Sequence, residues 1–105
     1  MSASSKLATL TRQIKIHLRA IEEKDIAKAE KKAVAEIKKA LRVLALDIRD
    51  YEYAETRAVQ TKWAKIARNN LTALEQNVLL LGDQLGPTDI AELSAHIDLL
   101  KSTIE

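Results

Sequence analysis

Apolar residues recur every three or four positions along most of the chain, which is the spacing of one face of an α-helix. The first run consists of Leu7, Leu10, Ile14, Leu18 and Ile21. The second consists of Ile26, Ala29, Ala33, Ile37, Ala40, Leu44, Ile48 and Tyr51. These runs predict helices over residues 5–23 and 26–50, with Ser4 or Ser5 as the N-cap of the first and Asp25 as that of the second.

A third run continues the pattern through Val59, Trp63, Ile66, Ala67, Leu71, Leu74, Val78, Leu81 and Leu85. Between Asp50 and Arg57 the helical phase is lost, because Glu55 stands where an apolar residue is due. An unbroken helix from Asp25 to Leu81 would be about 85 Å long, and its neighbours of under about 30 Å could not cover it. Either the chain breaks there, or the long helix is covered by a second copy; we expect a break and a helix over 57–82.

The clearest break in the pattern is Gly82-Asp83-Gln84-Leu85-Gly86-Pro87, since glycine ends helices and proline cannot continue one. Thr88 is then the expected N-cap of a last helix over 88–104. Its apolar positions, which step by three and four in the manner of a coiled-coil seam, are Ile90, Leu93, Ile97, Leu100 and Ile104. The sequence therefore predicts a C-terminal helical hairpin.

Composition supports an all-helical chain. The 105 residues include two glycines, one proline, no phenylalanine and no cysteine, so the turns and aromatic strands of a β-protein are missing. The length suits one domain, 1–105. We predict an all-α fold: a small antiparallel bundle of three or four helices with coiled-coil-like seams.

Charge is distributed unevenly along the chain. Residues 1–68 hold 16 Lys and Arg against 9 Asp and Glu, whereas residues 69–105 hold one Lys against 6 Asp and Glu. Seven cations fall within a sector of about 120° around the second helix, on a stripe about 27 Å long, at 100° and 1.5 Å per residue. They are Lys24, Lys28, Lys31, Lys32, Lys38, Lys39 and Arg42. This basic face is either a solvated surface that keeps the bundle soluble or a candidate binding surface for nucleic acid or an acidic protein. Lysine outnumbers arginine and no aromatic residues are interleaved, so nucleic-acid binding would be weak and non-specific.

The third predicted helix carries a candidate interface with another helix. Its candidate residues are Trp63, Leu71, Leu74, Val78, Leu79, Leu80 and Leu81, of which Leu79 and Leu80 point away from the seam. Asn70 and Asn77 flank that seam one and two heptads after the tryptophan, where asparagine can fix register. The leucines beyond the seam must be buried by another helix of this chain or by a partner.

The residues offer little material for catalysis. Without cysteine there are no thiol nucleophiles or thiolate metal sites. With two histidines and no glycine-rich loop, the usual sets of catalytic residues and phosphate-binding loops are also missing. Asp89, Glu92 and His96 share a face but are read as the polar flank of the last seam. Asp47 and its acidic neighbours Asp50, Glu52 and Glu55 are read as surface. We expect no catalytic, cofactor or metal site and no small-molecule substrate.

The sequence thus predicts a non-catalytic interaction, scaffold or adaptor module that self-associates or docks on another helical protein. The alternative is a nucleic-acid-associated protein that uses residues 24–42. The longest apolar runs are four residues, Val43–Leu46 and Val78–Leu81, so no membrane insertion is expected. A cytoplasmic location follows as an expectation.

Overall fold

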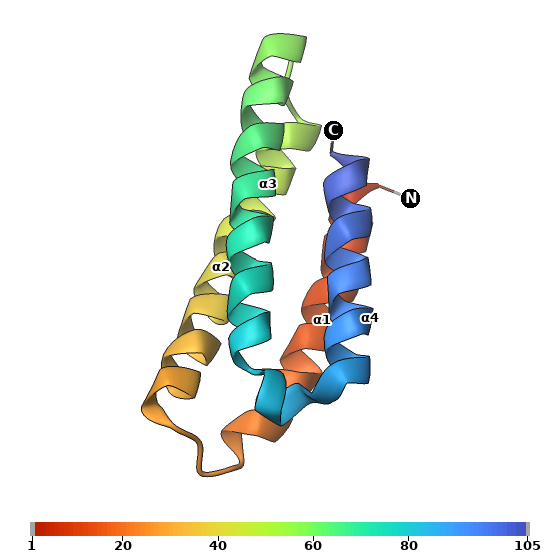
Figure 1. Ribbon diagram of the computed structural model, residues 1–105. Helices are drawn as coiled ribbons and strands as arrows, with labels where there is room; N and C mark the ends of the chain where they lie inside the picture. The colour runs from red at the N-terminus through yellow and green to blue at the C-terminus, as the bar shows by residue number, and fades with distance from the viewer. Residues whose placement is uncertain (1, 105) are drawn as a thin grey trace.

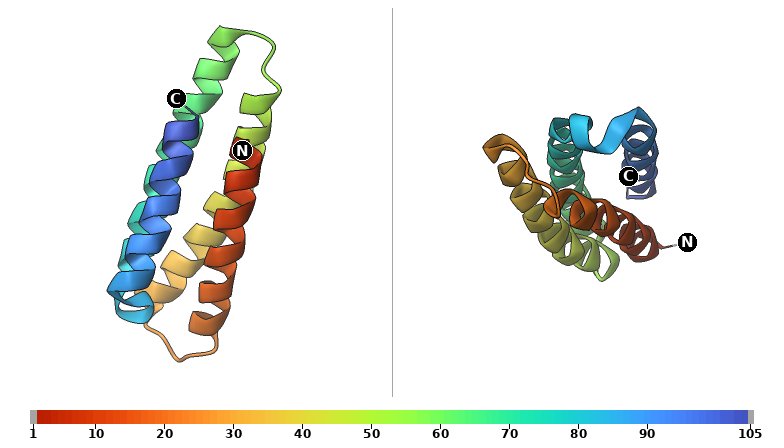
Figure 2. Two further views of the ribbon diagram at one scale, coloured as in Figure 1. Left: turned by 90° about the vertical axis from the view of Figure 1, so that its right-hand side faces the viewer. Right: turned by 90° about the horizontal axis from the view of Figure 1, so that it is seen from below.

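Within residues 2–104 the chain folds into four helices: α1 (Ala3–Glu22), α2 (Lys28–Glu52), α3 (Arg57–Leu80) and α4 (Gly82–Thr103). Figure 1 shows this computed structural model, which describes residues 2–104. Seen end on, the helices occupy the four corners of a bundle in chain order, so each runs antiparallel to the next and α4 returns beside α1 (Figure 2). The Lys6 Nζ donates a hydrogen bond of 2.7 Å to the Thr103 Oγ1 across this last contact. The predicted all-α helical bundle is confirmed, with four helices.

The core is formed by the apolar seams that the sequence marks out. Its fully buried side chains are almost all Leu and Ile: Leu10, Ile14, Ile21, Ile37, Leu44, Ile48, Leu71, Leu74, Leu81, Leu93, Ile97 and Leu100. On α2 the buried stripe is wider than predicted, since Val34 and Leu41 join it and face α1. Ala29 lies outside it, exposed in the first turn of α2. Each helix thus buries one face against two neighbours, as a four-helix bundle requires.

The middle of the chain breaks without glycine or proline, which rules out one long helix over residues 26–81. The α2 helix ends at Glu52, and Thr56 in extended conformation begins the next helix as its N-cap. The Thr56 hydroxyl accepts a hydrogen bond of 3.2 Å from the Val59 amide. The threonine thereby satisfies one of the amides that a helix start leaves unpaired.

The N-caps predicted for the first two helices are wrong. The first helix is capped by Ser2, not Ser4 or Ser5, because the Ser2 hydroxyl accepts from the Ser5 amide at 3.1 Å. The second is capped by Ala27 rather than Asp25, and the Glu30 carboxylate accepts from the Ala27 amide at 3.1 Å. Glu30, three residues after the N-cap, thus pairs the backbone amide of the N-cap residue through its side chain.

A further helical segment from Gly82 precedes the predicted last helix and joins it across Gly86, so Thr88 lies inside α4 and is not its N-cap. Leu81 and Leu85 are both buried, and they hold this corner against the core. The expected break survives as a kink at Gly86, which has φ 81° and ψ 161°. That backbone conformation favours glycine, and Pro87 follows it.

The α2–α3 hairpin extends beyond the ends of α1 and α4 (Figure 1). Its tip is mostly exposed: Tyr53 is 79% exposed, and residues 57–62 are exposed as well. The tip is therefore stabilised mainly by the two helices against each other.

Candidate docking groove between α1 and α2

The predicted basic face lies on the outside of α2. Lys24 precedes that helix and the other six cations lie on it, and all seven are exposed. Lys28, Lys31, Lys32 and Lys39 form no ion pair within residues 2–104. Lys38 and Arg42 lie nearer to α1 and border a groove between the two helices.

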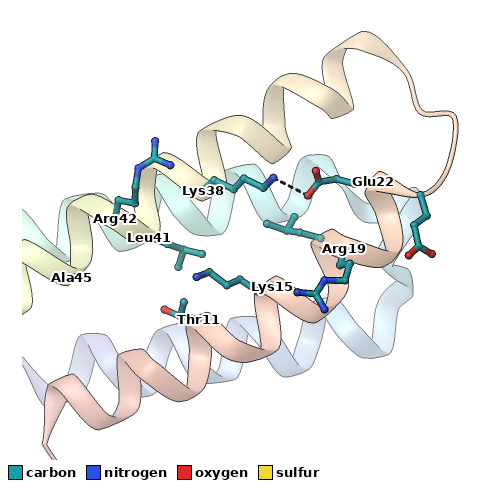
Figure 3. Close-up of a pocket in the computed structure, with 10 residues that line it drawn as sticks. Thr11, Lys15, Arg19, Glu22, Lys38, Leu41, Arg42 and Ala45 are labelled. Carbon is teal, nitrogen blue, oxygen red and sulfur yellow. Dashed lines mark ion pairs between the residues drawn. The ribbon is translucent and has the colours of Figure 1, made fainter.

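The groove has a volume of about 720 Å³ and is open to solvent. Its lining comes from both helices: Thr11, Lys15, Leu18, Arg19, Glu22 and Glu23 from α1 and the loop after it, and Lys38, Leu41, Arg42 and Ala45 from α2. Figure 3 shows Lys15 reaching toward α2 and Leu41 pointing toward α1. A second hollow of about 530 Å³ shares Thr11, Lys15 and Ala45, so the groove continues toward the start of α1 at Ser4.

The groove exists because small side chains face each other across α1 and α2. Ala8 and Thr11 on α1 and Ala45 on α2 line it, and they are too short to fill the space between the two helices. Leu18 and Leu41 form an apolar floor beneath them, but they are only 2% and 5% exposed. The apolar surface that the groove leaves open to water therefore comes mainly from the exposed Ala8 and Ala45.

Positive charge lines the walls of the groove. Arg12, Lys15 and Arg19 stand on α1, opposite Lys38 and Arg42 on α2. Helix α1 contains no Asp or Glu before Glu22, and α2 contains none between Glu36 and Asp47. The one ion pair between the walls is at one end, where Lys38 Nζ lies 2.8 Å from Glu22 Oε1 (Figure 3). At the other end Ser4 donates a hydrogen bond to Glu52.

The cations between these two ends have no acidic partner within residues 2–104. None of the ion pairs there involves Arg12, Lys15, Arg19 or Arg42. A helical wheel of either helix shows only the cations of that helix. That the two sets face each other depends on how α1 packs against α2. The structure thus brings the cations of α1 together with Lys38 and Arg42, at the edge of the basic face of α2, in one groove.

The predicted helix interface divides into two parts. Leu71, Leu74, Val78 and Leu81 are buried in the bundle's own core, so this seam is used within the chain. Trp63 is half-buried, and the Lys62 Nζ lies 5.5 Å from the centre of its ring. Leu79 and Leu80 stay at the surface, 54% and 66% exposed.

Asp47 is buried rather than on the surface, which corrects its reading as part of an acidic patch. It is 5% exposed, and its Oδ2 accepts a hydrogen bond of 2.6 Å from the Asn70 Nδ2 on α3. Asp47 follows Leu44 by three residues and precedes Tyr51 by four, a spacing that places it beside the seam. Asn77, the other seam asparagine, donates instead to the Ala73 carbonyl of its own helix at 3.0 Å.

The histidines and the acids near them form no cluster of the kind that holds metal. His17 Nδ1 on α1 lies 4.0 Å from Asp89 Oδ2 on α4, a contact that the distance between them in sequence conceals. Across residues 2–104, no three His, Asp or Glu side chains lie close enough together to share an ion. The His17–Asp89 contact is a surface pair that joins α1 to α4.

Comparison with family models, curated proteins and solved structures finds nothing that matches this chain. None of the helices within residues 2–104 combines the length and the apolar character needed to cross a bilayer. The residues that line the groove are therefore the basis for proposing its function.

Proposed function

We propose that this protein is a non-catalytic interaction module that binds an acidic, amphipathic helix of a protein partner in the groove between α1 and α2. The carrying observation is the combination of an apolar floor with Arg12, Lys15, Arg19 and Arg42, which have no acidic partner within residues 2–104. A helix with an apolar stripe flanked by carboxylates complements both features. The cytoplasmic setting and the docking on another helical protein expected from the sequence belong to this proposal.

The dimensions of the groove support a helical ligand. The lining runs along α1 from Ser4 to Glu23. At 1.5 Å per residue this is about 28 Å, or roughly five helical turns. Burial of the ligand's apolar stripe against Ala8 and Ala45 supplies part of the affinity, while the cations at the rim speed association and orient the ligand.

The test is binding of a labelled helical peptide of roughly 20 residues, whose Ala and Leu stripe is flanked by Glu on both sides, followed by fluorescence anisotropy. The groove variant Lys15→Glu/Arg42→Glu reverses one exposed cation on each wall. The matched control Arg57→Glu/Lys65→Glu makes the same charge change at exposed positions of α3.

We expect the wild-type chain and the control to bind the peptide, with affinity that falls as salt rises. The groove variant should lose at least about tenfold in affinity, since like charges would then face each other in the groove. Equal binding by the groove variant and the control would contradict the proposal, as would equal binding of a peptide in which Lys replaces Glu.

The outer face of α2 supports a second candidate function, non-specific binding of nucleic acid. Lys28, Lys31, Lys32 and Lys39 are exposed there and unpaired within residues 2–104. Such binding depends on phosphate contacts and weakens steeply with salt. A gel shift at about 50 mM salt should show retardation that Lys28→Glu/Lys32→Glu/Lys39→Glu removes. Absence of any shift at that salt concentration would eliminate this candidate.

A further inference from the structure

We infer that the occupant of the groove is the outer face of α4 from a second copy of this chain. The inference rests on the proposed function, since it names the partner of the same groove. Its evidence is a second surface of the bundle whose shape and charge complement the first.

The outer face of α4 is a ridge of small and apolar side chains. Ala91, Ala95 and Leu99 follow one another at intervals of four residues, and all three are exposed, Leu99 at 51%. The two alanines allow close approach of the helix backbone to a concave surface, and Leu99 presents the apolar side chain that the groove floor can bury. We call these three residues the α4 ridge.

Carboxylates flank the α4 ridge on both sides. At 100° per residue, Glu92 and Asp98 project about 60° to either side of Ala95. Both are exposed, and neither forms an ion pair within residues 2–104. Lys101 is the one lysine or arginine of α4, and it turns toward α3, where its Nζ lies 3.8 Å from Glu75 Oε1. The α4 ridge therefore carries negative charge on both edges.

Both walls of the groove carry cations, as both edges of the α4 ridge carry carboxylates. Arg12, Lys15 and Arg19 stand on α1, and Lys38 and Arg42 stand on α2. With the α4 ridge on the groove floor, one carboxylate faces the cations of α1 and the other faces those of α2.

The groove of a copy cannot be filled by its own α4. Helix α4 packs between α1 and α3, and its outer face points away from the α1–α2 side of the bundle (Figure 2). Two copies joined in this way use different surfaces, so the pair still has one free groove on one copy and one free ridge on the other. Such a heterologous contact adds further copies instead of closing as a pair.

Sedimentation equilibrium at low salt over a range of concentrations tests this arrangement. The ridge variant Glu92→Lys/Asp98→Lys and the groove variant Lys15→Glu/Arg42→Glu should each sediment as the 11.7 kDa monomer. Mixed in equal amounts they should associate again, because the unchanged groove of the ridge variant can take the unchanged ridge of the groove variant, and the two reversed surfaces are also complementary. The control Glu36→Lys/Glu55→Lys matches the charge change of the ridge variant at exposed positions elsewhere, and should behave as wild type.

For the wild-type chain we expect an average mass that rises continuously with concentration beyond that of a dimer. A mass of 11.7 kDa throughout would overturn the inference, as would a plateau at twice that value or a mixture of variants that stays monomeric. Binding of the acidic peptide distinguishes failure of this inference from failure of the proposed function. A wild-type chain that binds the peptide but stays monomeric keeps the proposed function and refutes the second copy, whereas loss of both refutes the groove itself.

Discussion

The hydrogen bond between Asp47 and Asn70 should make a measurable contribution to stability. It joins α2 to α3 at 2.6 Å, and Asp47 is 5% exposed, so water replaces a lost partner poorly. Hydrogen bonds to charged groups contribute about 1.5–3 kcal/mol, and leaving a buried charge unpaired costs a similar amount. Asn70→Ala should therefore lower the free energy of unfolding by about 2 kcal/mol. For a chain of this size, that corresponds to a fall in Tm of roughly 10 °C.

A double-mutant cycle isolates this pair. Asp47→Ala, Asn70→Ala and the double variant are unfolded in urea and followed by circular dichroism, with unchanged m-values as the sign that two-state unfolding persists. Asn77→Ala is the matched control on the same helix, because that amide donates only within α3. It should stay within about 0.5 kcal/mol of wild type. A coupling energy between Asp47 and Asn70 below about 0.5 kcal/mol would refute the reasoning.

Three further stability predictions follow from the fold, each measured by urea unfolding. Gly86→Ala should destabilise the fold by about 1–3 kcal/mol because φ is 81° at this residue. Gly82→Ala, at a helical position, should be neutral or slightly stabilising. Equal effects of the two substitutions would contradict the backbone conformation at Gly86. Leu74→Ala removes a fully buried side chain and should lower the free energy of unfolding by about 2–5 kcal/mol. Leu80→Ala should change that free energy little, because Leu80 is 66% exposed. The reverse order of effects would mean that α3 is rotated. Thr56→Ala should cost about 1 kcal/mol by removing the N-cap of α3, and an unchanged midpoint would show that the break does not depend on this cap.

Helical periodicity was sufficient to predict a bundle of three or four helices and most of their buried residues. Leu, Ile and Val at intervals of three and four leave little choice of face, and that choice is made within each helix. The loss of phase near Glu55 was enough to locate the break before α3, although no glycine or proline marks it.

Helix ends were predicted less well, since several residues compete to cap them. Ser2, Ser4 and Ser5 all carry a hydroxyl, and Asp25 is a better capping residue than Ala27 in isolation. The start of α2 is instead set by Glu30, whose carboxylate reaches back to the helix start. Such a choice depends on the path of the loop, which local sequence does not specify.

The groove was only half predictable for a related reason. A helical wheel shows the basic face of α2, but the position of Arg12, Lys15 and Arg19 across from it depends on how α1 packs. The short side chain of Ala45, which holds the groove open, looks in sequence like any other alanine of a helix. Burial of Asp47 was within reach of spacing arguments and was missed because acidic residues usually lie at the surface.

Because the α2–α3 hairpin projects beyond α1 and α4, the free energy of local unfolding should increase along the bundle axis from the tip of the hairpin to the core. Near its tip, α2 and α3 lose the support of α1 and α4, and residues 57–62 bury little side-chain surface. Amide protons there should exchange with deuterium through local fraying, whereas those around Leu44 and Leu74 should exchange only when the whole bundle unfolds. The exchange rates would then trace a continuous slope from tip to core. The tip is accordingly the place where an inserted peptide or reporter should disturb the rest of the fold least.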